Sequence, residues 1–440
     1  MIRRKLCALA KLFVFAAALL AIGAVDRATA QSFPSPVGGT LTCTGSTCTI
    51  VGGPFSGATG SYNSLTGAFT ANFGTCTVSG SAVTGTFTFS PGCAATISST
   101  ATLGRSAQQV SQVSVSAVHS LITGVRDGLQ GQRNTSPAAL RYTWDDDSLE
   151  AAMNYTSKGV AQKPVFKAMP KPVMMRTITY ALWGQGFGDV EWRSGTFAGI
   201  DLGRTTTTVG GIGGADVTIT NIFSATDAYV IGVLGGYTSA RVRNSDGSTA
   251  RVDGPGVGLY SIYVNGGFST DSTFKVDFFD LNRSVTGLPD LGLHLTNYTS
   301  AYNVNYKFDM KPWWLEPTVG FSYTSTNWDG ASKALGFIDG HTWRVQAGVR
   351  LGTAYDWNGV TVEPTLTAMA YSDVEIRGGT IAIAAGIPTA PTDEGKVFGQ
   401  GIAKLNFIWN THLSSYLEGE VRGREGVLGA AGRVGLRYAF

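Results

Sequence analysis

The sequence predicts an all-β fold: a twelve-stranded antiparallel transmembrane β-barrel, preceded by a small β-rich module that contains disulfides, a helix and a linker. Three observations support this prediction. Charged residues make up only 14% of the 440 residues, against roughly 25% in ordinary soluble domains. Apolar and polar residues alternate with period two from Thr177 to the end of the chain. No internal apolar run reaches the roughly 18 residues of a membrane-spanning helix, so strands are favoured.

The N-terminus has the pattern of a secretory signal peptide over residues 1–30. Basic residues at 3–5 precede an apolar core at 12–25, and the small-x-small sequence at 28–30 fits a cleavage site. We therefore expect export through the Sec pathway and a mature chain that starts near Gln31. The net charge of +3 gives no nucleic-acid signature.

Residues 31–101 differ from the rest of the chain, since they are rich in Gly, Ser and Thr and almost free of charge. Short alternating pieces separated by Gly and Ser predict small strands joined by turns. Four cysteines in an exported segment suggest two disulfides, and three pairings are possible. The sequential pairing, which closes short loops, joins Cys43 with Cys48 and Cys76 with Cys93. A metal site is the alternative, but this segment contains no histidine.

Residues 102–130 change to a helical period and predict an amphipathic helix. The apolar positions include Ala107, Val110, Ala117, Leu121 and Val125. Gly124 and Gly128 weaken the predicted end of this helix. The helix could pack on the preceding module, self-associate, or lie in or near the barrel lumen.

Residues 131–176 are interpreted as a solvated linker because prolines and lysines are frequent in their second half. The acidic run at 145–147 could bind calcium, but three adjacent carboxylates lack the alternating spacing of a calcium loop.

The alternation in residues 177–440 places aromatic and aliphatic side chains on one face of each strand and polar ones on the other. A soluble barrel would have the same alternation inverted, but the export signal, the strand count and the aromatic C-terminus favour a lipid-facing wall around a wet lumen. The charges expected to face the lumen are Lys275, Asp277, Lys307, Glu316, Arg344, Arg350, Glu363, Lys404, Glu418, Glu420, Arg422, Arg433 and Arg437.

Turn signals suggest two different rims for the barrel. Short connections are predicted at 266–267, 309–312, 356–359 and 410–411. Longer connections are predicted at 243–253, 286–294, 329–340 and 377–395. This asymmetry is typical of short periplasmic turns and long external loops.

Several segments together resemble the C-terminal β-domain of classical autotransporters (type V secretion). They are residues 183–188 (WGQGFG), 232–237 (GVLGGY), 256–260 (GVGLY) and 434–440 (VGLRYAF). The resemblance implies a twelve-stranded barrel in the outer membrane of a Gram-negative bacterium, a chain segment through the lumen, and export of the N-terminal portion. It also implies that Val434, Leu436, Tyr438 and Phe440 resemble the signal read by the barrel-assembly machinery.

The chain departs from this family in two respects. The part before the barrel is short and lacks a β-solenoid passenger, and a Pro-rich linker stands where a lumen helix usually precedes the first strand. The expected function is an anchor that translocates a short passenger to the cell surface, whose ligand the sequence does not identify. The alternative is a channel or structural barrel with a periplasmic module and no translocation.

The sequence shows no constellation for catalysis, cofactors or metals. His119, His294, His341 and His412 are scattered without metal-ligand spacing, and no Gly-x-Ser-x-Gly motif occurs. Residues 147–149 resemble part of an esterase block, but Asp146 stands where that block needs Gly. We therefore expect neither an enzyme nor a resident cofactor.

Overall fold

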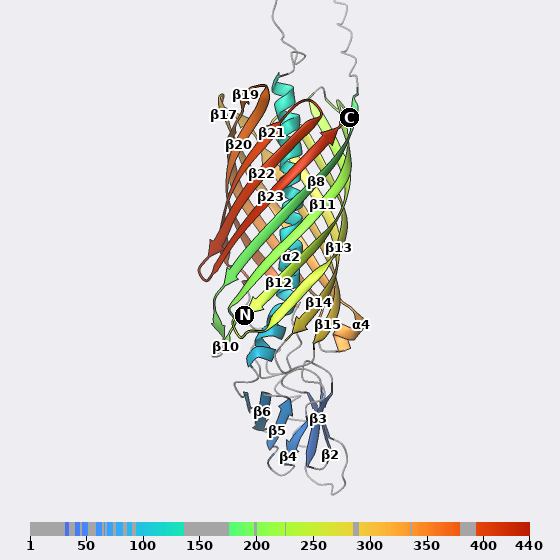
Figure 1. Ribbon diagram of the computed structural model, residues 1–440, viewed down its shortest axis with the longest axis vertical. Coiled ribbons are helices and arrows are strands. Elements are labelled where there is room, and N and C mark those ends of the chain that lie inside the picture. Colours follow the sequence, from blue (N-terminus) through green and yellow to red (C-terminus); the bar gives the residue numbers. More distant parts are fainter. Residues whose placement is uncertain are drawn as a thin grey trace, which may run out of the picture.

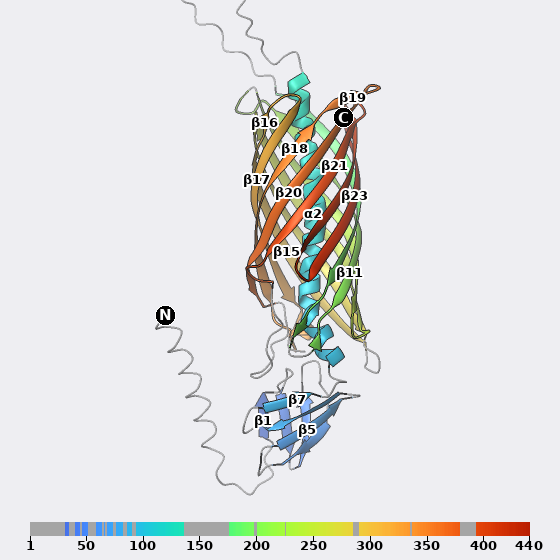
Figure 2. The same ribbon diagram turned by 90° about the vertical axis from the view of Figure 1, so that its left-hand side faces the viewer.

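The computed structural model shows a barrel traversed by a long helix, with a small sheet beyond one end (Figures 1 and 2). The predicted signal peptide and most of the predicted linker lie outside the described residues. These are 31–34, 40–44, 46–51, 59–63, 66, 68–73, 76–81, 86–89, 94–135, 176–197, 200–224, 226–284, 290–334, 337–378 and 393–440.

Twelve long antiparallel strands form the barrel, as predicted. Their bounds are β8 (Ile178–Arg193), β11 (Arg204–Thr220), β12 (Asp227–Asn244), β13 (Thr249–Asn265), β14 (Phe268–Ser284), β15 (Leu291–Tyr306), β17 (Trp313–Trp328), β18 (Gly340–Thr353), β20 (Val360–Arg377), β21 (Val397–Ile408), β22 (Leu413–Arg424) and β23 (Val427–Ala439). Four short strands lie at the rims: β9 (Thr196–Phe197), β10 (Ile200–Asp201), β16 (Phe308–Asp309) and β19 (Tyr355–Trp357).

The barrel closes between its first and last strands. β23 pairs with β8 in a register that runs from Val427 opposite Arg193 to Ala439 opposite Ala181. Phe440 extends the seam, because its backbone N–H donates to the Tyr180 carbonyl at 2.8 Å and its carbonyl accepts from the Tyr180 N–H at 3.0 Å. Closure leaves no free edge in this sheet, which is the requirement for strands that cross lipid.

The two faces of the wall differ as the alternation predicts. Large apolar side chains are exposed on the outside, and aromatic rings gather there in contact with one another. Tyr323 and Trp343 have ring centroids 4.7 Å apart, and Phe321 lies between Trp343 and Tyr302 at 6.1 and 5.8 Å. The inner face carries buried polar and charged side chains.

Glycines on the inner face make room for inward-pointing aromatic rings. A Cβ on Gly214 would come within 2.5 Å of the ring of Trp183, which lies directly opposite on β8. The same relation recurs in four more cross-strand pairs: Gly210 with Phe187, Gly232 with Tyr260, Gly352 with Trp314, and Gly435 with Tyr416. Ring-on-glycine packing therefore fixes the register at five places.

The connections define two rims. The short-turn rim carries the 266–267 turn, the 409–412 turn and the C-terminus. The long-connection rim lies at the opposite end and carries the connection between β17 and β18, which contains the short helix α4 (Gly330–Ala334). The prediction of a long connection at 243–253 was wrong. β12 extends to Asn244 and β13 begins at Thr249, and Asp246 accepts hydrogen bonds from Ser248 that close a tight turn.

The helix α2 (Ala94–Thr135) passes through the lumen along the barrel axis (Figures 1 and 2). It begins eight residues before the predicted start and ends five after the predicted end, so the predicted bounds of the module, helix and linker were wrong there. Packing in the lumen stabilises a helix that residue propensity alone would not extend through Gly124 and Gly128. Within the described residues, no helix combines the length and apolarity needed to cross a bilayer.

The N-terminal module forms a seven-stranded antiparallel sheet in sequential order. Its strands are β1 (Gln31–Pro34), β2 (Thr40–Thr44), β3 (Thr47–Val51), β4 (Thr59–Tyr62), β5 (Ala68–Phe73), β6 (Cys76–Ser81) and β7 (Thr86–Phe89). Cys43 and Cys48 are directly opposite each other on β2 and β3, and Cys48 is buried. Cys76 begins β6, whereas Cys93 lies outside the described residues.

Candidate functional site in the barrel lumen

Two apolar clusters hold α2 against one side of the barrel. In the middle of the helix, Val118, Leu121 and Ile122 pack among inward residues that include Val230 and Ile262. Near the long-connection rim a second cluster contains Leu103, Ala107 and Val110 of α2. Its other members are Ala240, Val242, Ala250, Val252, Phe279, Leu281, Leu293, Leu295 and Trp328 of the wall, with Phe337 from the connection between β17 and β18. The main contacts of α2 are therefore with strands β11 to β17.

A buried ion-pair network joins α2 to the wall. Arg126 donates to Glu316 at 2.5 Å, and both side chains are fully buried. Arg350 bridges the same carboxylate at 2.7 Å and Asp127 of α2 at 2.7 Å. Asp271 lies 3.6 Å from Arg126 on its other side. Two adjacent residues of the helix, one cation and one anion, are thus each matched by an opposite charge on the barrel.

Further polar contacts follow the helix toward the long-connection rim. Ser111 donates to Asp277 at 2.9 Å, and Asn297 donates to the Ser111 hydroxyl at 2.9 Å. Ser120 donates to Glu418 at 2.6 Å, and Lys404 donates to the Ser120 carbonyl. These hydrogen bonds fix the rotation and height of α2, because each pairs one helix position with one wall position.

The structure brings six of the thirteen predicted lumen charges into contact with α2. They are Asp277, Glu316, Arg350, Lys404, Glu418 and Arg433, the last of which donates to Ser116 at 3.1 Å.

The other seven interact within the inner wall or lie buried there. Lys275 pairs with Asp277, Arg344 with Asp373, Glu420 with Arg422 and Arg433, and Arg437 with Asp216. Lys307 lies 4.5 Å from the centre of the Trp314 ring, and Glu363 is buried.

Sequence reasoning missed the carboxylates that balance these cations. Asp189 and Glu191 pair with Arg422, while Asp216, Asp271 and Asp373 serve other lumen groups. Asp189 and Glu191 continue the period of Phe187 at two-residue steps, so strict extension of the alternation would have found them. Arg126 and Asp127 gave no such signal, since charges on a predicted helix normally face water.

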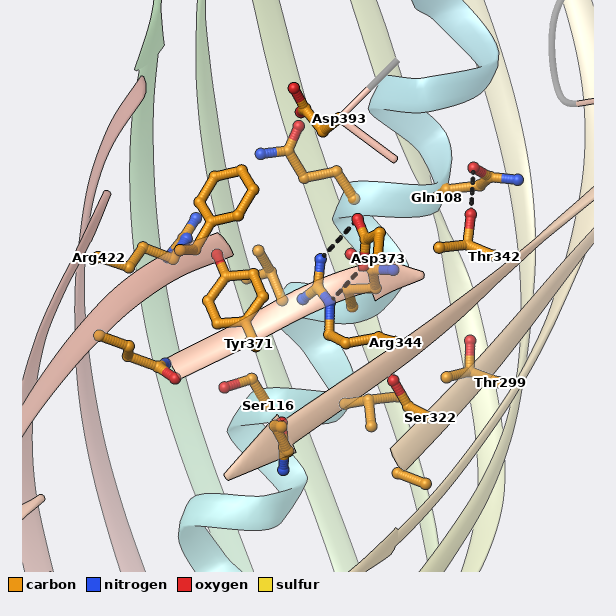
Figure 3. A pocket seen from close by; sticks show the side chains of 18 of the residues that line it. Gln108, Ser116, Thr299, Ser322, Thr342, Arg344, Tyr371, Asp373, Asp393 and Arg422 are labelled. Carbon is orange, nitrogen blue, oxygen red and sulfur yellow. Dashed lines mark hydrogen bonds and ion pairs between the residues drawn. The ribbon is translucent and has the colours of Figure 1, made fainter. Parts of the chain in front are cut away.

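A cavity of about 200 Å³, here called the lumen cavity, lies in the lumen and is lined mainly by polar and charged side chains. It lies between α2 and the wall near the long-connection rim (Figure 3). Arg344 forms a bidentate pair with Asp373 at 2.7 and 3.2 Å, and Thr342 donates to Gln108 of α2 at 3.2 Å. The residues that the structure describes include no group of three or more His, Cys, Asp or Glu suited to a metal ion.

The predicted assembly residues lie on the outside of the closing strand. Val434, Leu436, Tyr438 and Phe440 are each more than half exposed and lie on one face of the seam. Phe440 stacks on Tyr180 of β8 with ring centroids 6.2 Å apart. The terminal aromatic residue is therefore part of the lipid-facing surface at the short-turn rim.

A closed twelve-stranded barrel that is apolar outside, charged inside and traversed by the helix preceding its first strand defines an outer-membrane β-barrel with an occupied lumen. The autotransporter beta-domain model matches residues 182–420, more than half of the chain, and the chain belongs to this family. It is accordingly an outer-membrane protein. No curated protein sequence matches it.

Solved structures similar to this chain include three autotransporter domains. The β-domain of Bordetella BrkA has 16% identity and a TM-score of 0.46, with 59% of this chain and 98% of that one covered. The AIDA-I transport unit from Escherichia coli has 16% identity and a TM-score of 0.44, with 67% and 98% covered. The NalP translocator domain from Neisseria meningitidis has 11% identity and a TM-score of 0.43, with 59% and 88% covered.

Proposed function

We propose that this protein is an autotransporter that carries its own N-terminal module, residues 31–93, through the barrel and anchors it at the cell surface. The observation that carries the proposal is the direction of α2. The C-terminal end of α2 and the start of the first barrel strand, β8, both lie at the short-turn rim, whereas the N-terminal end of α2 lies at the long-connection rim. Among the described residues, α2 therefore crosses the lumen from one rim to the other ahead of the barrel wall.

The orientation of the barrel determines where the module ends up. Short turns face the periplasm in bacterial outer-membrane barrels, and longer connections face outward. A chain that crosses the lumen from the short-turn rim to the long-connection rim would then place everything before Ala94 outside the cell. The outer membrane would be reached through the Sec pathway and the barrel-assembly machinery, with Val434, Leu436, Tyr438 and Phe440 as the assembly signal.

We further propose that α2 remains in the lumen after translocation and tethers the module. Supporting this, Arg126 and Asp127 form buried ion pairs with the wall, and breaking such a pair by removing one partner typically costs 3–5 kcal/mol. The apolar clusters around Leu103 and Leu121 add to the same docking.

The module itself is proposed to contain a disulfide between Cys43 and Cys48. The two positions face each other across β2 and β3, and the Cys48 side chain is buried. Directly opposite positions in an antiparallel pair have Cβ atoms about 4.5–5.5 Å apart, slightly more than the 3.5–4.5 Å that a disulfide requires. Mass spectrometry of the non-reduced protein should recover the two cysteines in one linked peptide.

Epitope accessibility on intact cells tests the export proposal. One variant carries an epitope after Gln31, and the matched control carries it after Gly266 in the short-turn rim. We expect antibody to bind the first on intact cells and the second only after the outer membrane is opened. A module epitope that stays hidden until permeabilisation would instead favour a channel or structural barrel with a periplasmic module.

Protease shaving gives an independent readout if the enzyme is chosen for this sequence. Residues 31–104 contain no lysine or arginine, so trypsin cannot cut there. Proteinase K on intact cells should remove the module and leave a barrel-sized fragment.

A further inference from the structure

Arginines outnumber their partners where the lumen cavity meets the long-connection rim. Arg193 of β8 and Arg204 of β11 are directly opposite each other in register, and like charges in that relation destabilise a sheet. Arg193 is compensated, since it pairs with Glu191 at 2.5 Å and with Asp393. Arg204 has no ion pair to any residue in the described part of the chain, and its buried Nε has no hydrogen-bond partner there.

Arg105 of α2 is a second guanidinium that forms no ion pair with a carboxylate among the described residues. It donates to the side-chain oxygens of Gln108 at 3.1 Å and Thr342 at 3.4 Å, and both partners are neutral. Arg105 and Arg204 both line the lumen cavity and are close enough for their charges to repel each other. Two cations from different elements therefore converge on one space.

The carboxylates that line the cavity are already paired with other arginines. Asp373 is held by Arg344 in a bidentate pair, Asp393 by Arg193 and Arg424, and Glu191 by Arg193 and Arg422. The rim connections outside the described residues add none, because residues 198–199, 285–289 and 379–392 contain no Asp or Glu. The same holds for the whole stretch from residue 28 to 104. Asp373, Asp393 and Glu394 are near enough to attract Arg105, and Glu191 and Asp393 to attract Arg204, but none of the described carboxylates forms an ion pair with either arginine.

We propose that the lumen cavity binds a small oxyanion, of the phosphate or carboxylate class, between Arg105 of α2 and Arg204 of β11. Arg105 and Arg204 are half-buried. Taking an unpaired cation partly out of water is costly, and a bound anion with charge-assisted hydrogen bonds lowers that cost. The volume of about 200 Å³ admits one such ion with several waters, each of which takes about 30 Å³ in the liquid. Gln112, which also lines the cavity (Figure 3 shows its surroundings), is a neutral donor for the remaining oxygens.

The bound ion would join the helix to the wall, because Arg105 belongs to α2 and Arg204 belongs to β11. The site exists only while α2 occupies the lumen, and it depends on that placement rather than on translocation of the module. An oxyanion in the cavity therefore strengthens the docking of α2 on its more polar side.

Titration calorimetry on the full chain refolded in detergent tests the site. The ligands are inorganic phosphate and acetate, each added against a chloride background of equal ionic strength. We expect one ion per chain. Arg204→Gln and Arg105→Gln should each weaken binding by about tenfold or more, the factor that follows from the loss of one charge-assisted hydrogen bond.

The matched control is Arg251→Gln, an exposed arginine on β13 that pairs with Asp253 on the outer wall; it should leave the affinity unchanged. Heat-dependent migration on a gel establishes that each variant is folded. Phosphate binding without acetate binding identifies a tetrahedral oxyanion, and comparable binding of both identifies a site that also takes carboxylates. The proposal is overturned if the folded wild-type protein binds neither ion, or if the folded Arg204→Gln and Arg105→Gln variants keep wild-type affinity.

Discussion

Replacing Arg126 of α2 by methionine should release the helix from the wall without opening the barrel. The substitution removes a fully buried cation that lies 2.5 Å from Glu316 and leaves that carboxylate with Arg350 alone. Breaking a buried pair costs about 3–5 kcal/mol. Because Arg350 still compensates Glu316, we expect the lower end, about 3 kcal/mol, which raises the undocked fraction of α2 by roughly two orders of magnitude.

Single-channel recording in planar bilayers measures this fraction directly, since an undocked helix opens the lumen. Arg126→Met should spend a much larger share of time in a high-conductance state than the wild type. The double variant Arg126→Met/Glu316→Met removes both charges and should recover most of the closed state, because a buried pair replaced by apolar groups is often neutral. Arg251→Met on the outer wall is the control. Equal conductance of Arg126→Met and the wild type would refute this reasoning. So would a double variant in which the effects of Arg126→Met and Glu316→Met on the high-conductance state simply add.

Three further predictions address the seam, the inner wall and the rim. Deleting Phe440 removes two backbone hydrogen bonds to Tyr180 and should reduce assembled barrel far more than export across the inner membrane, as measured by the heat-modifiable band against the processed chain; equal loss of both would contradict it. Gly214→Val should cost about 1–3 kcal/mol by overpacking against Trp183, whereas Gly184→Val has open space and should be tolerated; equal folded yields would count against the packing. Asp393 lies outside the strands and loses hydration on burial, yet Arg193 and Arg424 hold its pKa below the usual value. Its ion pairs should therefore stabilise the rim above about pH 4 and lose this effect as the pH falls further. Backbone hydrogen exchange at 393–396 should rise in that range, and Asp393→Asn should raise it at neutral pH; exchange that neither change alters would show that Asp393 does not hold this segment.

The strands and their faces could be predicted because lipid and lumen impose opposite chemistry on alternate residues. β15 illustrates this, since Tyr298 and Tyr302 are exposed on the outer wall while Asn303 and Asn305 are buried inside. A one-residue error would exchange the two faces, so the pattern fixes the register as well as the strand. Closure through β23 followed from the same alternation in the last fourteen residues.

The helix and one rim connection could not be bounded from the sequence. The extension of α2 to Ala94 and through Gly128 depends on packing in the lumen, which local propensity does not encode. The tight turn between β12 and β13 depends on hydrogen bonds that Ser248 donates to Asp246, whereas the polar residues around it were interpreted as a loop. Hydrophilic composition alone does not distinguish a loop from a strand that projects beyond the lipid.

The inner-wall cations could be listed from alternation, but their partners could not. Arg126 and Asp127 lie on α2. From the sequence this helix could pack on the N-terminal module, self-associate or lie in the lumen. Only the fold brings Arg126 to Glu316, 190 residues away. The approach of Arg105 and Arg204, two arginines without ion pairs among the described residues, is likewise a property of the assembled lumen.

Cross-linking of α2 to the wall tests directly whether this helix occupies the lumen. Ser111 and Asn297 are 2.9 Å apart between side-chain atoms, so cysteines at these two positions should form a disulfide in cells, identified by mass spectrometry. Cysteines at Gln112, which lines the lumen cavity, and Asn297 should not. Absence of the Ser111→Cys/Asn297→Cys bridge in folded barrel, or equal cross-linking of both pairs, would contradict a lumen occupied by α2.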